Sequence, residues 1–141
     1  MQKGTVIFCR DFVFDDGAVD PKLLIILNDF KEGFNHIAVL TTSVQGKYPF
    51  SVGCHASKNV FIIDENVDFF ISRTFVQINR IVEYDPMVLK KNISTKRIKI
   101  EHTLREETIN NIIDCVKKSM DVEINYINII DTTNSSTSAF Q

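Results

Sequence analysis

The chain has 141 residues, the size of one ordinary domain, and 44% of them are hydrophobic against 24% charged. This composition excludes an intrinsically disordered chain, and a formal charge of −2 excludes a global attraction to nucleic acid or anionic membranes. Any site for a polyanion must therefore be a local patch of cations.

The cysteines and the apolar segments indicate the compartment. No segment has the roughly 18 apolar residues that a membrane-spanning helix needs, and the N-terminus lacks the apolar core of a signal peptide. The three cysteines, Cys9, Cys54 and Cys115, are widely spaced and include no CxxC pair. An odd count argues against a disulfide framework, so we expect reduced cysteines in a cytoplasmic protein that does not bind a membrane.

The first part of the chain predicts strands. All five glycines and all three prolines lie at or before residue 86 and separate short runs of β-branched and aromatic residues. The expected strands are TVIFCRDFVF, KLLIIL, HIAVLTTS, NVFII and RTFVQINRIVEY. This spacing predicts a small barrel or a strongly bent antiparallel sheet. Between the first two strands, Asp15-Asp16-Gly17 and Pro21 predict an open loop that carries Asp20 and Lys22 across the surface.

After residue 86 the pattern changes. The segment MVLKKNISTKRIKIEH predicts one more strand, because Ile98 and Ile100 alternate with basic residues. Thr103 and Glu106 have the spacing of a capping box and predict a helix over about 104–120. The next segment, DVEINYINII, fits either an extension of this helix or another strand. We expect a single domain over 1–130 and a flexible polar tail over 131–141.

Few residues form a pattern typical of catalysis. The three histidines form neither HxH nor HExxH, and glycine loops that bind phosphate are absent, so we expect no metal and no cofactor. Cys54 beside His55 would suggest a thiol nucleophile, but adjacent residues of a strand point to opposite faces. His55 is then either an exposed loop residue or a functional histidine. A metal-dependent hydrolase that uses His55 and Cys54 is a further alternative.

Hydroxyl and basic side chains gather where strands begin or end. Thr41, Thr42 and Ser43 follow the run IAVL, where they either finish a strand at the solvent or face a substrate. Lys22 begins one apolar run and Arg73 precedes another, which are ordinary positions for cations. The segment 90–99 is the only dense basic stretch, and it is either a solvated strand face or a stripe that contacts phosphates.

The order of these elements resembles the MazF/PemK-like toxin family. KGTVIFCRDFVFDDGAVDPKLLIIL is similar to the family's opening, where a glycine precedes the first strand and a basic residue with proline leads into an apolar strand. VLTTS is similar to the family's strand that ends in a threonine/serine pair, and NVFIIDENVDFFISRTFVQINRI to the strands that follow. The resemblance lies in pattern and order over about residues 3–120, and it includes the C-terminal helix.

The resemblance implies an SH3-like barrel with a C-terminal α-helix, a toxin of a toxin–antitoxin pair that cuts single-stranded RNA without a metal. It implies single-stranded RNA as substrate, an antitoxin protein as partner, and a homodimer. Together with the basic and aromatic residues of the chain, it implies a catalytic set of Lys22, Thr41, Thr42 and His55. The implied RNA-binding set is Arg10, Ser43, Tyr48, Arg73, Lys96 and Arg97.

The chemistry suits these residue types. RNA can be cut by its own 2′-hydroxyl, so the protein needs a base, an acid, and donors for the charge that builds on phosphorus. Lys22 and a threonine hydroxyl would be donors, and His55 or His36 would titrate near neutral pH. Tyr48 and Phe50 would stack on bases.

One position departs from the family's motif. The family has a catalytic arginine immediately before the proline, whereas here Asp20 precedes Pro21 and Lys22 follows it. A lysine offers a point charge without the guanidinium fork, and Arg10 or Arg73 would have to replace the missing arginine. The departure favours an alternative, a non-catalytic SH3-like module that binds protein or nucleic acid.

Overall fold

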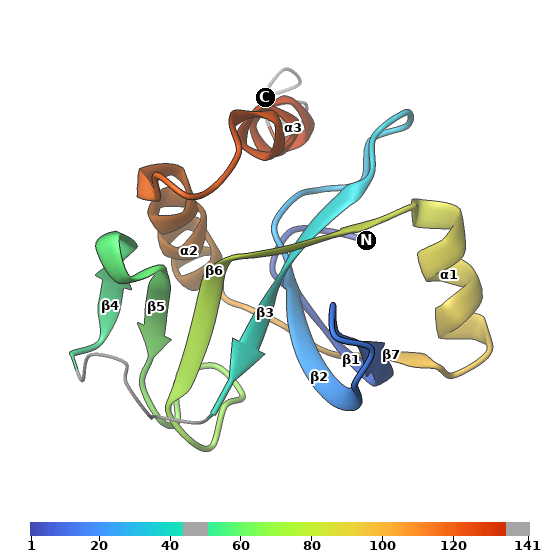
Figure 1. Cartoon of the computed structure of the whole chain (residues 1–141), viewed down its shortest axis with the longest axis horizontal. Helices are drawn as coiled ribbons and strands as arrows, with labels where there is room; N and C mark the ends of the chain where they lie inside the picture. Colours follow the sequence, from blue (N-terminus) through green and yellow to red (C-terminus); the bar gives the residue numbers. More distant parts are fainter. Residues whose placement is uncertain (44–50, 135–141) are drawn as a thin grey trace.

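The structure, a computed structural model, describes residues 1–43 and 51–134 (Figure 1). It is mainly β, with one antiparallel sheet of seven strands in the order β4-β5-β6-β3-β2-β1-β7. The strands are β1 (Thr5–Val13), β2 (Val19–Ile26), β3 (His36–Thr42), β4 (Gly53–His55), β5 (Val60–Ile63), β6 (Thr74–Tyr84) and β7 (Ile98–Thr103). A short 3-10 helix, η1 (Ala56–Lys58), connects β4 and β5.

Helices lie on both faces of the sheet. Figure 1 shows α1 (Pro86–Ser94) on one side and α2 (Glu106–Lys118) and α3 (Ile124–Asn134) on the other. Since successive strand residues point to opposite faces, each central strand feeds two hydrophobic clusters. One cluster includes Val6, Ile25, Val39, Ile109 and Ile112, and the other includes Ile7, Leu24, Ala38, Leu40 and Leu89. Burial on both faces explains why these strands are continuous apolar runs rather than alternating ones.

The first helix corrects a sequence prediction. The sequence predicts residues 87–94 as part of a strand, but they belong to α1, and the strand is confined to β7. Asp85 caps α1, because its carboxylate accepts hydrogen bonds from the N–H groups of Met87 at 2.8 Å and Val88 at 3.3 Å. Pro86 stands at the start of the helix, where its missing N–H costs nothing.

The second helix has a cap that differs from the predicted one. Thr103 belongs to β7, and α2 begins at Glu106 without a capping box. Asp68, in the loop between β5 and β6, caps the helix instead. Its carboxylate accepts hydrogen bonds from the N–H of Arg105 and the hydroxyl of Thr108, each at 2.8 Å. The segment that fitted either a helix or a strand forms α3, which continues to Asn134, past the predicted domain end near residue 130.

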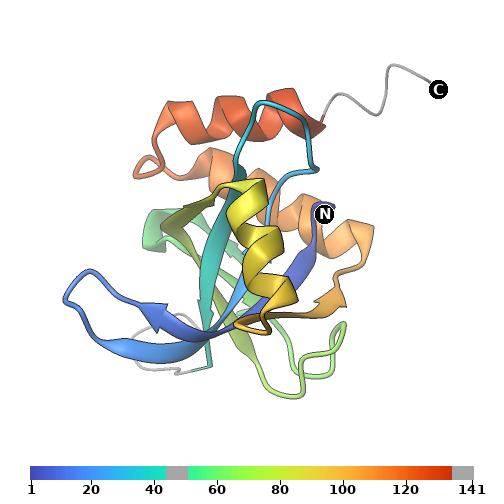
Figure 2. The same ribbon diagram turned by 90° about the vertical axis from the view of Figure 1, so that its right-hand side faces the viewer.

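The connection between β1 and β2 is tighter than predicted. A turn over residues 14–18 joins the strands, so that Asp20, Pro21 and Lys22 lie within β2 and not in a surface loop. Pro21 is opposite a bulge, because the register of β1 shifts between Cys9 and Phe12. A proline fits at this irregularity, where no ladder donor is needed. The hairpin projects from the body of the molecule (Figure 2).

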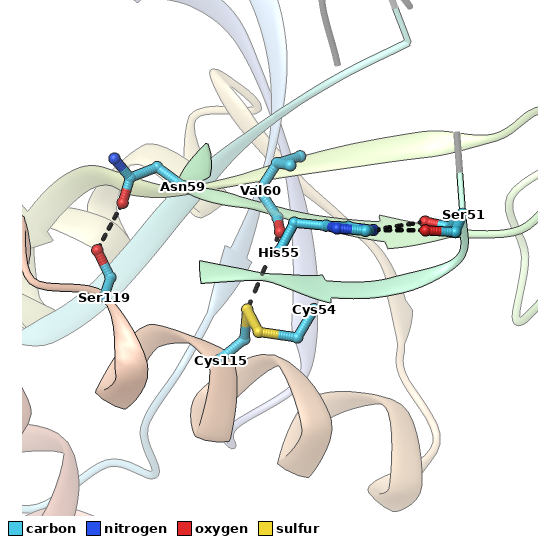
Figure 3. Close-up of a disulfide and its surroundings, with 7 residues drawn as sticks. All are labelled: Ser51, Cys54, His55, Asn59, Val60, Cys115 and Ser119. Carbon is cyan, nitrogen blue, oxygen red and sulfur yellow. Dashed lines mark hydrogen bonds between the residues drawn. A yellow bond between two sulfur atoms is a disulfide. The ribbon is translucent and has the colours of Figure 1, made fainter. Parts of the chain in front are cut away.

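Two cysteines are joined, which overturns the expectation that all three are reduced. Cys54 of β4 and Cys115 of α2 form a disulfide across a sequence separation of 61 residues (Figure 3). Cys9 is the remaining free cysteine. An odd count excludes complete pairing but is compatible with one bond and one thiol left over, and a pairing at this separation leaves no local spacing pattern.

The disulfide should stabilise the fold measurably. Because it closes a long loop in the unfolded chain, we expect Cys54→Ser to lower the free energy of unfolding by about 2–4 kcal/mol. Cys54 is exposed, so the serine leaves no cavity. Urea denaturation of the oxidised protein checks this, with Cys9→Ser as the control that keeps the bond. Equal midpoints for Cys54→Ser and the unaltered protein would contradict the expectation.

His36 should make stability depend on pH. Burial lowers its pKa from the ordinary value of 6.5, as does the N-terminal amino group, and a hydrogen bond with the Asn28 carbonyl opposes them. The unfolded state then binds more protons, so stability is full above pH 6.5 and is lost as pH falls through the lower folded-state pKa. The loss amounts to at most about 1.4 kcal/mol per pH unit. Urea titrations from neutral to acid pH should show a smaller decline for His36→Gln, and parallel profiles would refute the assignment.

Candidate functional site

Two neighbouring strands of the sheet part from each other near its centre. The ladder between β2 and β3 ends at the pair Leu24 and Leu40. Beyond it, β3 continues along β6 as far as Thr42, whereas β2 continues along β1 as far as Val19. The two strands therefore diverge as a fork, which can be followed in Figure 1.

Side chains take over where the ladder stops. The hydroxyl of Thr41 donates to the carbonyl of Leu23 at 2.9 Å, and the ammonium of Lys22 donates to the carbonyl of Thr41 at 3.4 Å. Thr41 is only 4% exposed, so its hydroxyl serves the fold at this point. The Thr41 carbonyl lies beyond the last ladder pair, and the Lys22 ammonium satisfies it. The Thr41 hydroxyl adds a second bond between the two strands at the fork.

A cleft of about 580 Å³ lies at the fork. Its walls come from β2, β3 and β1, and from residues 69–72 and 74 in the loop that leads into β6 and at the start of that strand. The lining consists of Phe8, Pro21, Lys22, Leu23, Thr41, Thr42, Ser43, Phe69, Phe70, Ile71, Ser72 and Thr74. Among these described residues Lys22 is the one charged side chain. The cleft thus combines apolar surface with one cation and a rim of hydroxyls.

The covering loop is held on two sides. The ring of Phe69 lies 4.4 Å from that of Phe70 and 4.8 Å from that of His102 on β7, measured between centroids. Asp68, next in the chain, is bonded to the start of α2 through Arg105 and Thr108. The cleft is therefore built from anchored elements, which is typical of a preformed binding site.

Lys22 is positioned by both strands. Its ammonium lies 5.7 Å from the centre of the Phe14 ring, at cation–π distance, as well as beside the Thr41 carbonyl. A lysine has three N–H donors, and the carbonyl of Thr41 takes one of them. The side chain is half-buried, so a ligand in the cleft meets a cation that is already oriented.

The structure brings together four of the residues predicted from the sequence. Lys22, Thr41, Thr42 and Ser43 all line the cleft. Thr41 faces inward and bonds to β2, whereas Thr42 is half-buried and Ser43 is exposed at the rim. The three consecutive hydroxyls therefore have different surroundings, and Thr42 and Ser43 are the more accessible to a ligand.

His55, Arg73 and His36 do not line the cleft. His55 lies on β4, three positions from β3 in the strand order, with Nε2 2.8 Å from the Ser51 carbonyl and 3.0 Å from its hydroxyl (Figure 3). Arg73 forms an ion pair with Asp64 at 3.4 Å. His36 begins β3, about 20 Å of extended chain from Thr42.

The predicted basic residues gather elsewhere. The N–H of Arg10 donates to the carbonyl of Arg97 at 3.3 Å, which places both residues at the edge formed by β1 and β7. Lys96 lies two residues beyond the end of α1, in the left-handed conformation with φ at +63°. Tyr48 and Phe50 lie outside the described residues.

Sequence reasoning missed the apolar part of the cleft. Phe8, Phe69, Phe70 and Ile71 reach it from β1 and from the loop after β5. Their positions depend on contacts between distant segments, and DFFIS carries no local pattern that marks it as the cover of a site.

No family model matches the chain, and no curated protein matches it. In residues 1–43 and 51–134 no three His, Cys, Asp or Glu side chains group as metal ligands. Within the same ranges no helix is long and apolar enough to cross a membrane.

The Asp68 cap on α2 should contribute to the stability of the fold. The Asp68 side chain is fully buried and accepts hydrogen bonds from the Arg105 N–H and the Thr108 hydroxyl. Asp68→Asn leaves one acceptor oxygen for these two donors and removes the negative charge beside the Arg105 guanidinium. We expect a loss of about 1–2 kcal/mol in the free energy of unfolding. Asparagine keeps the left-handed backbone that Asp68 adopts at φ +55°. Glu65→Gln in the same loop is the exposed control in urea denaturation, and equal effects would contradict the assigned role.

Proposed function

We propose that the cleft between β2 and β3 binds single-stranded RNA and cuts it without a metal, as the MazF/PemK-like toxins do that the sequence resembles. One observation carries the proposal: Lys22 of β2 and Thr42 and Ser43 at the end of β3 converge on one cleft with apolar walls. A nucleotide presents an anionic phosphate together with a flat, largely apolar base, and this cleft offers a surface to each.

The cleft suits a reaction in which RNA supplies its own nucleophile. The 2′-hydroxyl attacks the adjacent phosphorus and loses its proton to water, the bond to the 5′-oxygen breaks, and the protein stabilises the charge that builds on the phosphate oxygens. Lys22 would donate to such an oxygen, and the hydroxyls of Thr42 and Ser43 would orient the phosphate. A protonated Lys22 is also the acid available to the leaving oxygen.

A second candidate is a module that binds RNA without cutting it. The specific observation in its favour is that the described lining holds neither an imidazole nor a carboxylate to accept the proton of the 2′-hydroxyl. The replacement of the family's arginine by Asp20, Pro21 and Lys22 points the same way.

In the described residues the sheet is not closed into a barrel. Its edge strands, β4 and β7, do not pair with each other in the described residues, but both are linked to α2. The disulfide joins β4 to this helix, and the loop of Asp68 and Phe69 joins the helix to β7. We infer an opened barrel in which these links replace strand pairing. The disulfide removes the argument from reduced cysteines for a cytoplasmic location. That location, a homodimer and an antitoxin partner belong to the same proposal and rest on the family resemblance.

The function can be tested with long single-stranded RNA in EDTA. We expect the oxidised protein to cut it, and Lys22→Ala and Thr42→Ala to reduce the rate by about 100-fold, as for other donors to a developing oxyanion. His55→Ala and Lys118→Ala should cut normally, because both residues lie outside the cleft. Circular dichroism confirms that each variant is folded.

The alternative outcomes are distinct. Intact RNA that binds the protein in an anisotropy assay, and binds Lys22→Ala more weakly, would establish the binding module. RNA that is neither cut nor bound would overturn both candidate functions.

A further inference from the structure

A row of paired residues crosses the sheet from the cleft to its free edge. Phe8 of β1 pairs with Leu23 on one side and with Lys99 of β7 on the other. Directly paired residues of antiparallel strands point to the same face. Leu23 and Phe8 line the cleft, so Lys99 stands on the same face, about 4.8 Å beyond Phe8 at the backbone.

Lys99 is accessible at this edge. Its side chain is 73% exposed, and β7 is the last strand of the sheet in the described part of the chain. The ammonium lies 3.8 Å from a carboxylate oxygen of Glu101, which the bulge in the β1–β7 register places next to it. An exposed ion pair of this length contributes little, so a phosphate can replace the carboxylate.

Other cations lie beside Lys99. Arg97 is two residues away in the chain, and its carbonyl accepts the hydrogen bond from the N–H of Arg10. The Arg10 side chain is 64% exposed and lies 3.4 Å from the carboxylate of Asp11. Lys96 completes the group. This edge therefore concentrates cations in a chain whose formal charge is −2, with Asp11 and Glu101 as the carboxylates paired to them.

We propose that an RNA strand held in the cleft continues over Phe8 onto this edge, where Lys99, with Arg97 and Arg10, holds a second phosphate. The site then binds a strand of several nucleotides, whereas a dinucleotide occupies the cleft alone. This inference rests on the proposed binding of RNA at the cleft and defines the extent of the substrate.

Two probes separate the cleft from the edge. We would measure anisotropy with a labelled dinucleotide and with a labelled strand of about 10 nucleotides, within the range that single-strand sites cover. Both carry 2′-O-methyl groups, which remove the nucleophile and prevent cutting. Each is titrated at several salt concentrations with the oxidised, full-length protein.

The two substitutions on β7 should change the affinity for the long probe in opposite directions. Lys99→Met should weaken the binding of the long probe. It should also reduce the slope of log affinity against log salt concentration by about 0.7, the value for one phosphate contact on a single strand. Glu101→Gln removes the carboxylate that pairs with Lys99. It should therefore strengthen the binding of the long probe and make its salt dependence steeper. Neither change should affect the dinucleotide. Lys22→Ala should weaken both probes, and Lys118→Ala, at the far end of α2, neither.

The outcomes distinguish the two proposals. Suppose that both probes bind and that Lys22→Ala lowers the affinity of each, but that neither Lys99→Met nor Glu101→Gln changes the affinity of the long probe. The extension onto β7 is then wrong, and the cleft proposal stands. If neither probe binds the unaltered protein, both proposals fall. A fold lost in Lys99→Met would leave Glu101→Gln to decide, because its expected gain in affinity cannot come from unfolding.

Discussion

The structure depends on the hydrogen bond from the Thr41 hydroxyl to the Leu23 carbonyl, at the point where two central strands separate. A sheet that opens in its interior leaves backbone groups without ladder partners, and such groups are costly when buried. Lys22 satisfies the Thr41 carbonyl beyond the last ladder pair, and the Thr41 hydroxyl adds a side-chain bond to the Leu23 carbonyl. β2 remains paired to β1 and β3 to β6, so both halves keep their cores while a cleft opens between them.

This arrangement resolves the two meanings of the hydroxyl run at the end of β3. Thr41 finishes the strand, because its hydroxyl is buried and committed to β2. Thr42 and Ser43 follow on the rim of the cleft. A strand that ends by leaving its neighbour needs one hydroxyl for the fold and exposes the next ones, so a structural and a ligand-facing role coexist within three residues.

The strands could be anticipated, because apolar runs are local features of the sequence. The convergence of Lys22 with Thr42 was implied only by the family resemblance, and Lys22 reaches the cleft from β2 rather than from the predicted loop. The start of α1 could also be predicted, since Asp85 and Pro86 are typical of a helix N-terminus. The alternation of Ile98 and Ile100 instead extended the predicted strand over the residues of this helix. The Asp68 cap and the disulfide were out of reach, because their partners lie 37 and 61 residues away. Contacts at that separation leave no spacing pattern, and those of Asp68 hold the loop that lines the cleft.

The bulge of β1 connects the cleft to the basic edge. At Arg10 and Asp11 the strand gains one residue relative to β2, and Pro21 occupies the opposing position. A proline within β2 is compatible with this irregularity because it has no N–H to donate. On its other side the same stretch of β1 turns the N–H of Arg10 to Arg97, which draws the cations of β1 and β7 together. Pro21, which precedes Lys22 at the fork, and the bulge beside the edge cations therefore belong to the same irregularity of the β1–β2 ladder. A change that regularised β1 would alter the cleft and the edge at once.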